Sequence, residues 1–336
     1  MKHRVSLIGV FACAVCLVMT LAGCSQSTAY TPETLNPTVS SPTIGKDNTL
    51  RVGIGGGAPF FVSTNSSSAA SGLDVDMAAA LADQLGLKLE VVSLGTSEVD
   101  VQSALAKGDV DIVTSATSSD KSDSVWVSDP YTQTGIALFA SPGTAAPPKT
   151  DVPKIAAQSS STSAWAVTNA FGEDALVANS DLLSALSSVE TKSATYVAAD
   201  AVIGSYAALG QNVDVVPVAV LGTVGGYGVA VSASNTDLQK AVSDALATIS
   251  GNGVAGIVCS KWLGSAIDLS ALPVIEVSTS KASSAKTGDS DESSSEKTSD
   301  ETSVSEESSV SADDGVEPKT EAGANAVLPQ GTSSAA

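Results

Sequence analysis

Three segments decide the fold of this chain: GLDVDMAAALADQLGLKLEVV (72–92), ALAKGDVDIVTSA (104–116) and DSVWVSDPYTQTG (123–135). Within the first, Met77, Leu81 and Leu85 lie at helical spacing, and Gly86 stands where a left-handed C-cap is expected. The pattern predicts helices over 74–85 and 99–105 and strands over 50–54, 88–94 and 110–113. Strands that alternate with helices in this way predict a parallel sheet covered on both faces, with ligands beyond the carboxyl ends of the strands.

The composition excludes several kinds of chemistry. The only histidine is His3, so the chain beyond it offers none for a catalytic triad or a histidine-ligated metal site. The 36 acidic residues outnumber the 16 basic ones, which argues against a nucleic-acid partner because phosphate binding needs basic patches. The negative charge is explained either by a solvated exterior or by a cationic ligand, and a solvated exterior is the simpler explanation. We expect no catalytic residue, no metal and no cofactor.

The amino terminus has the pattern of an export signal. Lys2 and Arg4 precede an apolar run over 5–21, which ends in LAGC at 21–24. This resembles a bacterial lipoprotein signal, which implies removal of residues 1–23 and lipid attachment to Cys24. An uncleaved membrane span is the alternative, since about 17 apolar residues is near the lower limit for one. Residues 24–48, rich in Ser, Thr and Pro, are then predicted to be a tether.

The carboxyl-terminal part changes character twice. Residues 278–336 are Ser, Glu, Asp, Lys and Thr without periodicity, which predicts disorder because too little apolar area is available to offset the ordering entropy. The segment IDLSALPVIEV (267–277) stays open between a linker and an extra strand on the folded body. Cys259, the only cysteine after Cys24, lies in a helical, apolar context that favours a buried, inert thiol over a reactive one.

The order and spacing of the three opening segments resemble the bacterial extracellular solute-binding proteins of family 3, the polar amino-acid branch of ABC-importer proteins. The resemblance implies an α/β, two-lobed type 2 periplasmic-binding-protein fold, in which each lobe is a mostly parallel sheet flanked by helices and two hinge crossings join the lobes. GIALFASP (135–142) resembles the strand that leaves the first lobe, and residues 227–253 with KWLG (261–264) resemble the return. Lobe 1 is thus predicted over 49–140 plus 224–264, and lobe 2 over 143–222.

The resemblance also implies ligand contacts in lobe 1. Phe60 and Phe61 match the loop after the first strand, where an aromatic ring stacks on the ligand, and we expect one of them in that role and the other in the core. Lys121 falls where the family has an arginine that binds the ligand's carboxylate, and Ser115 and Thr117 flank the hydroxyl position. Because lysine offers a point charge in place of a bidentate fork, an ordinary surface lysine is the alternative.

Two motifs place ligand contacts in lobe 2. IAAQSSSTSAW (155–165) resembles the family's strand-to-helix turn, with Ser160, Ser161 and Thr162 at its binding positions, and ordinary helix capping is the alternative. TYVAADAVIGSYAAL (195–209) resembles the element whose second aspartate takes the ligand's amino group. Asp200 holds the first of those positions and Ser205 the second, so the expected negative charge is missing.

We therefore expect a lipid-anchored, monomeric solute-binding component of an ABC importer on the extracytoplasmic face of a bacterial membrane. It would capture an amino acid or a related small polar solute and deliver it to a membrane permease. The alternative is an orphan binding module of the same fold, used for sensing, adhesion or protein interaction without transport. An enzyme is a third interpretation, since a few proteins of this fold are dehydratases, but the pocket motifs contain neither histidine nor clustered paired carboxylates.

Overall fold

The computed structural model describes residues 35–63, 70–95 and 99–278. The chain falls into two compact units, residues 1–35 and 36–336, and of the first unit only Leu35 is described. The predicted signal over 1–23, the lipid attachment at Cys24 and nearly all of the predicted tail lie outside the described residues. All other described residues, 36–278 with the two gaps, belong to the second unit.

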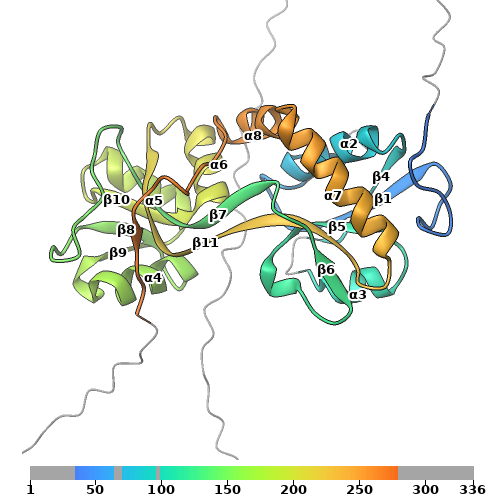
Figure 1. The fold of residues 1–336 in the computed structure, drawn as a ribbon. Coiled ribbons are helices and arrows are strands. Elements are labelled where there is room, and N and C mark those ends of the chain that lie inside the picture. The colour runs from blue at the N-terminus through green and yellow to red at the C-terminus, as the bar shows by residue number, and fades with distance from the viewer. Residues whose placement is uncertain (1–34, 64–69, 96–98, 279–336) are drawn as a thin grey trace, which may run out of the picture. The chain divides into compact units, whose positions relative to one another are not determined.

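Lobe 1 is the group of elements around the first parallel strands (Figure 1). Its described elements are β1 (Thr49–Ile54), β2 (Val62–Ser63), β3 (Ala70–Ser71), α2 (Leu73–Gln84), β4 (Lys88–Ser93), α3 (Val101–Ala106), β5 (Ile112–Ala116), the 3-10 helix η1 (Ser118–Asp120), β6 (Val125–Val127), α7 (Thr236–Gly251) and α8 (Val254–Leu263). Lobe 2 contains β8 (Ile155–Gln158), α4 (Thr162–Phe171), the 3-10 helix η2 (Glu173–Ala175), β9 (Leu176–Asn179), α5 (Leu182–Glu190), β10 (Tyr196–Asp200), α6 (Ala201–Gln211) and β12 (Val274–Ile275). Two long strands, β7 (Thr132–Ala140) and β11 (Val216–Ser232), run between the lobes.

The main sheet has the order β4-β1-β5-β11-β7-β10-β8-β9, so the crossing strands β11 and β7 join the sheets of the two lobes. β1 pairs in parallel with β4 and β5, and β8 pairs in parallel with β9 and β10. The crossing strands are antiparallel to these neighbours and to each other. The predicted α/β class with parallel strands in each lobe is therefore confirmed.

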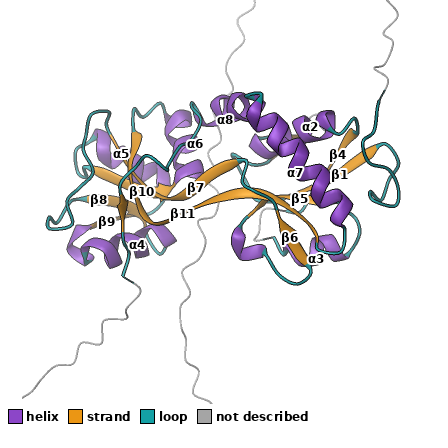
Figure 2. Ribbon diagram, viewed as in Figure 1, coloured by secondary structure: helices purple, strands orange, loops and turns teal. Residues whose placement is uncertain are grey.

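Helices cover both faces of each sheet (Figure 2). In lobe 1, the side of β1 that carries Leu50, Val52 and Ile54 packs with α2 and α7, whereas Val113 of β5 packs with α3 on the opposite side. In lobe 2, α5 and α6 cover one face and α4 covers the other. The alternation of side chains along each strand produces these two apolar faces.

The helices form where apolar spacing and capping agree. The predicted helix over 74–85 is α2, and Gly86 follows it with φ +67°, a conformation that glycine adopts without steric cost. In α7, five apolar residues at helical spacing share one face and are all buried: Leu238, Val242, Ala245, Leu246 and Ile249. Asn235 caps that helix by accepting the Leu238 N–H.

The last part of the predicted tether packs on lobe 1. Ile44 is fully buried, and the backbone N–H of Thr38 donates to the carbonyl of Leu85 at the end of α2. The Asn235 side chain donates to the carbonyl of Thr43 at 2.8 Å. Residues 36–48 therefore contribute to the folded body, because an apolar side chain and several backbone groups in this stretch have partners on lobe 1.

The segment over 267–277, which the sequence left open, adds a strand. Val274 and Ile275 form β12, which pairs in parallel with Val220 and Leu221 of β11. Leu269 is buried, and its N–H donates to the side chain of Gln133 at 2.7 Å. The extra-strand alternative is thus the one that the structure shows.

Helix α8 is tied to α2 by a polar contact. Asp76 of α2 accepts hydrogen bonds from the Lys261 ammonium at 2.5 Å and from the Trp262 indole N–H at 2.6 Å. Cys259 lies on the buried side of α8, as predicted, and burial raises the pKa of its thiol. Among the described residues, no single helix is long and apolar enough to cross a membrane, and α7 and α8 meet that measure only as a pair bent by 72°.

Candidate functional site

One strand of each lobe ends against a crossing strand, β5 against β11 and β10 against β7. Ala116, the last residue of β5, pairs with Gly228 of β11. Asp200, the last residue of β10, pairs with Ile136 of β7. Between these two points β7 and β11 pair with each other. Because ligands bind beyond the carboxyl ends of parallel strands, this stretch of the hinge and the loops beside it form the candidate ligand site.

In lobe 1 a buried carboxylate organises the end of β5. Asp74, at the start of α2, accepts hydrogen bonds from the Tyr131 hydroxyl at 2.6 Å and from the Ser115 hydroxyl at 2.7 Å. The Ser115 N–H donates back to the Tyr131 oxygen at 3.0 Å. Ser115 has φ +56°, a left-handed conformation that is uncommon for a residue with a Cβ and that its polar partners stabilise here. Ser115 is therefore oriented by Asp74 and Tyr131.

The two predicted aromatic residues differ in burial. Phe60 is 8% exposed, and its ring meets that of Tyr227 edge to face, with centroids 5.0 Å apart and planes at 75°. Its carbonyl accepts the Asp74 N–H at 3.2 Å, so Phe60 is part of the core beside the hinge. Phe61 is half-buried and packs against the same core from outside. Of the two, Phe61 is the more exposed residue and is the one that we expect to contact a ligand.

The remaining predicted residues of lobe 1 lie around η1. The side chain of Thr117 caps this turn, and both its hydroxyl and its N–H donate to Asp120, at 2.9 Å and 2.7 Å. Lys121 follows η1 and is exposed. Within the described residues its ammonium group has no hydrogen-bond or ion-pair partner, unlike that of Lys46, Lys240 or Lys261. A free ammonium at this position is available to an anionic group.

In lobe 2 the predicted turn leads into α4. Ser160 is exposed and has φ +58°, which explains why glycine suits this position better. Ser161 is the N-cap of α4: its hydroxyl accepts the Ala164 N–H at 3.1 Å and donates to the Gln158 carbonyl at 2.7 Å. Thr162 is the first residue of the helix and is half-buried. Helix capping therefore accounts for Ser161, while Ser160 and Thr162 have no such bonded role in the described part of the chain.

The last predicted pair lies at α6. Asp200 is the N-cap of this helix and accepts the N–H groups of Val202 and Ile203 at 2.9 and 3.0 Å. It also accepts hydrogen bonds from Thr134 and from the Tyr227 hydroxyl, both on the crossing strands. Ser205 is half-buried on α6. Because these donors already surround Asp200, this carboxylate does not replace the missing ammonium-binding charge at Ser205.

The carboxylates of Asp74, which is buried, and Asp200, which is half-buried, both have altered acidities. Burial raises the pKa of Asp74 and of Asp200, although the hydroxyl and N–H donors around each oppose the shift. Burial also raises the pKa of Tyr227 well above its ordinary value, and the neighbouring charge of Asp200 adds to that rise. Two carboxylates, Asp74 in lobe 1 and Asp200 in lobe 2, therefore accept hydrogen bonds from hydroxyl groups near the crossing strands.

The sole arginine in the described residues belongs to the frame of lobe 1. Arg51 forms an ion pair with Asp111 at 2.6 Å and donates to the Gly108 carbonyl at 2.7 Å. Its guanidinium group is therefore occupied away from the crossing strands. As the sequence indicated, no arginine of the described chain is available for a bidentate grip on a ligand carboxylate.

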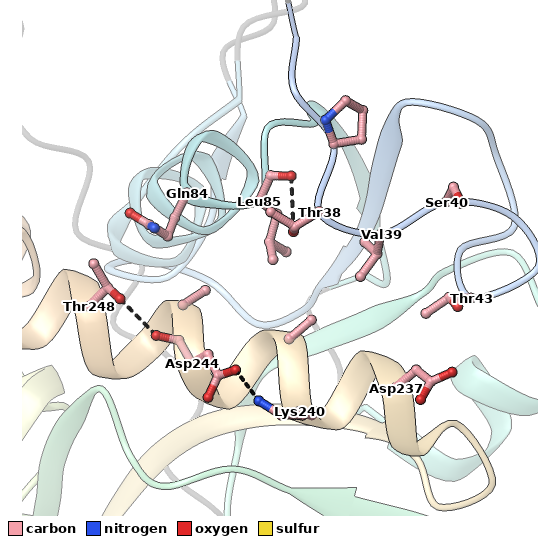
Figure 3. A pocket seen from close by; sticks show the side chains of 13 residues that line it. Thr38, Val39, Ser40, Thr43, Gln84, Leu85, Asp237, Lys240, Asp244 and Thr248 are labelled. Atoms are coloured by element: carbon pink, nitrogen blue, oxygen red, sulfur yellow. Dashed lines mark hydrogen bonds and ion pairs between the residues drawn. The ribbon is translucent and has the colours of Figure 1, made fainter.

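A cavity of about 520 Å³ lies elsewhere on lobe 1, between the amino-terminal segment, the end of α2 and the outer side of α7 (Figure 3). No predicted ligand-binding residue lines it. Its walls are formed by Pro37, Thr38, Val39, Ser40, Thr43, Gln84, Leu85, Asp237, Lys240, Ala241, Asp244, Ala245 and Thr248.

Sequence reasoning missed the polar residues that organise the hinge. The sequence patterns assign no role to Tyr131, Thr134 or Tyr227, and they place Asp74 only in a helix. A signal was present, because Asp74 begins a helix between apolar residues where an unpaired charge would be costly to bury. Such a position predicts hydroxyl or N–H partners, but the sequence does not say which ones.

Several solved structures of solute-binding proteins are similar to this chain. The chain is similar to the ancestral cationic amino-acid solute-binding protein AncCDT-1, at 26% identity over 64% of this chain and 96% of that one, with a TM-score of 0.53. It is also similar to the L-cystine solute receptor of Neisseria gonorrhoeae, at 22% identity over 65% and 94% of the two chains, with a TM-score of 0.56. A polar amino-acid ABC uptake transporter substrate-binding protein from Streptococcus thermophilus shares 19% identity over 66% and 89%, with a TM-score of 0.54.

Two lobes joined by paired crossing strands, with the strand ends of both lobes at that crossing, define a protein of the type 2 periplasmic-binding-protein fold. The sequence profile of the bacterial extracellular solute-binding proteins, family 3, matches residues 50–265. The chain belongs to that family. Comparison with curated proteins finds no match.

Proposed function

We propose that this protein is the extracytoplasmic solute-binding component of an ABC importer and captures an amino acid or a related small polar solute between its lobes. The observation that carries the proposal is the meeting of both lobes' strand ends at the paired crossing strands β7 and β11. A solute there contacts both lobes at once, so its binding energy favours the closed arrangement. Membership of family 3 and the amino-acid receptors among the similar structures support it.

The predicted contact residues favour a particular chemistry for the solute. Lys121 supplies one free ammonium, Thr162 and Ser205 supply hydroxyls, and Phe61 supplies a half-buried ring. No guanidinium fork is available, and Ser205 stands where a carboxylate would meet an ammonium. The set favours a solute with one acidic or carbonyl group and a weak requirement for a cationic one. No catalytic step is needed for this role.

Two substitutions test the solute chemistry. Lys121→Ala should weaken binding of an anionic solute by about 10- to 150-fold, the effect of losing a charged hydrogen bond of about 1.5–3 kcal/mol. Ser205→Asp should improve binding of a zwitterion by about tenfold or more, because it restores a partner for the ammonium group. Titration calorimetry on the wild type and both variants measures these changes, and an affinity for a plain amino acid that neither substitution alters would contradict the site.

The orphan-module alternative keeps one specific observation in its favour. The two charged side chains that bind both ends of an amino acid in the resembled family are a lysine and a serine here, at Lys121 and Ser205. A module that has stopped transporting amino acids no longer needs those charges. Failure of every transported class of solute to bind, in the screen described next, would favour this alternative.

A thermal-shift screen of the chain from Ser25 onward tests the proposal. Amino acids, amines, organic acids, oligopeptides and vitamins are each added, and a solute at about one hundred times its dissociation constant should stabilise the protein by roughly 2.7 kcal/mol. A reproducible rise in melting temperature with one chemical class identifies the solute. The absence of any shift at millimolar concentration of all classes would contradict the role of a small-solute receptor.

Lipid anchoring makes a separate prediction. Cys24→Ala should abolish incorporation of labelled fatty acid in cells, because the thiol of Cys24 is the expected lipid acceptor at the processed terminus. The variant should be released from the membrane fraction, whereas Cys259→Ala, the matched control at the buried thiol, should remain labelled. Fatty-acid labelling that persists in the Cys24 variant would show that the lipoprotein assignment is wrong.

A further inference from the structure

The crossing strands have a break in their pairing that defines a pivot. β7 and β11 pair on both sides of the break, with one further register shift between Pro217 and Ala219, but Thr134 faces Gly225 while Ile136 faces Leu221. Three residues of β11 therefore lie opposite Gly135 alone, and that glycine has no room for a side chain because a Cβ would come within 2.9 Å of the Thr223 carbonyl oxygen. An interruption of this kind leaves backbone groups outside the ladder and permits local bending.

One carboxylate bridges this break. Asp200 closes β10 on the lobe 2 side, where it pairs with Ile136 and caps α6. Its Oδ2 accepts hydrogen bonds from Thr134 and, at 3.4 Å, from the Tyr227 hydroxyl. Thr134 and Tyr227 both lie on the lobe 1 side of the break. We call Thr134, Asp200 and Tyr227 the hinge triad.

Lobe 1 fixes Tyr227 from two directions. Its ring packs edge to face on Phe60, in the loop after β1, and its carbonyl accepts the Tyr131 N–H at 2.9 Å. Phe60 and Tyr131 both connect to Asp74, through the Phe60 carbonyl and the Tyr131 hydroxyl. Tyr227 therefore moves with lobe 1, whereas Asp200 moves with α6 and lobe 2.

We propose that the hinge triad holds the angle between the two lobes and that Thr134 and Tyr227 are positioning residues for solute capture. A rotation about the break between Gly135 and residues 222–224 carries Asp200 away from at least one hydroxyl donor. Because Asp200 is half-buried, water replaces a lost donor only in part, and the rotation is opposed. This inference rests on the proposed function only for its second part, the effect on solute affinity.

The geometry predicts a coupling between angle and affinity. A solute shifts the equilibrium between the open and closed lobe arrangements only by the difference between its affinities for them. If closure lengthens hydrogen bonds of the hinge triad, the solute's contacts with both lobes must also offset the energy of those bonds. Weakening the triad therefore changes the population of lobe arrangements before any solute is added. Solute affinity changes as a consequence, while the contacts at Lys121 and Ser205 stay the same.

The test removes hydroxyl groups and leaves shapes intact. Thr134→Val and Tyr227→Phe delete the two side-chain donors, singly and together, and avoid the loss of the α6 cap that substitution of Asp200 would cause. Tyr196→Phe is the matched control, since its hydroxyl donates to the Ala145 carbonyl within lobe 2 at 2.8 Å. Spin labels at Ala79→Cys on α2 and Ser187→Cys on α5, both exposed positions, report the distance between the lobes in the chain from Ser25 onward.

Double electron–electron resonance on the solute-free protein should give a shifted or broadened interlobe distance for Thr134→Val/Tyr227→Phe, and the wild-type distribution for Tyr196→Phe. Each single variant should lie between the two. Distributions that coincide with the wild type in all triad variants, even with a lower melting temperature, would overturn the proposal and assign the triad to stability alone. Since no solute is present, the result does not depend on whether the proposed importer role is correct.

Discussion

Replacing Asp111 with alanine is expected to lower the free energy of unfolding by about 3–5 kcal/mol, because it leaves a mostly buried guanidinium without its counter-ion. The Asp111 side chain is 4% exposed and that of Arg51 is 16% exposed. Asp111 accepts the N–H groups of Gly45 and Arg51, each at 2.8 Å, as well as two guanidinium hydrogen bonds. The carboxylate therefore joins the amino-terminal segment, β1 and the start of β5. Urea unfolding followed by circular dichroism measures the loss.

The matched control is Glu90→Ala, which removes the exposed partner of Lys46 on the same sheet. That ion pair should contribute at most about 1 kcal/mol, because water and salt screen charges at the surface. Equal losses for Asp111→Ala and Glu90→Ala would show that burial does not determine the energetics of this edge of lobe 1.

The second large effect is expected at Asp74. Asp74→Ala leaves the hydroxyls of the buried Tyr131 and the half-buried Ser115 without their acceptor, and each such loss costs about 1–3 kcal/mol. We therefore expect a destabilisation of about 2–6 kcal/mol in urea unfolding. Asp120→Ala is the control, since it removes a half-buried acceptor of the nearby Thr117 at the surface turn η1. A loss at Asp74 no larger than that at Asp120 would contradict the assigned role.

The same residue makes a pH prediction with a definite sign. Burial raises the pKa of Asp74 above its ordinary value of 3.8, so the folded protein binds this proton more tightly than the unfolded chain does. Its contribution to stability is therefore fully present below pH 3.8 and is lost as the pH rises through the folded pKa. Asp200 contributes with the same sign.

Asp74→Asn keeps an acceptor for Tyr131 but does not titrate. The free energy of unfolding of this variant should fall less steeply than that of the wild type as the pH rises above 3.8, with the remainder of the slope due to Asp200 and other groups. The measurement is urea unfolding at a series of pH values. Identical slopes in the two proteins would show that the Asp74 carboxyl does not retain its proton on folding.

Local pattern was sufficient to predict most elements of lobe 1. The helix α2 and its glycine stop follow from the spacing of Met77, Leu81 and Leu85 and from Gly86, and the strand β4 follows from the residues after that glycine. Each of these elements depends on residues that are close together in the sequence, so the spacing of apolar residues is enough to predict it. The pairing of distant strands needed the resemblance to a family.

The candidate site was harder to predict, because its chemistry depends on contacts between distant residues. Asp74 and Tyr131 are 57 positions apart, and Asp200 and Thr134 are 66 positions apart. Neither pair has a local spacing that sequence could reveal. The Ser, Thr and Pro content predicts that the tether ends at residue 48. In the structure, however, the apolar side chain of Ile44 and backbone hydrogen bonds hold the last part of the predicted tether on lobe 1. The composition of a segment is an average over its residues, so it does not reveal a single buried side chain.

The central claim is that the two lobes close on a small polar solute, and one measurement tests it most directly. The interlobe distance between labels at Ala79→Cys and Ser187→Cys is recorded without solute and at saturation with the compound that gives the largest thermal shift. We expect the distribution to move to a single, narrower new distance at saturation, and an unrelated compound from the screen to leave it unchanged. Saturating binding, proved by calorimetry, with an interlobe distance that does not change would contradict capture by lobe closure.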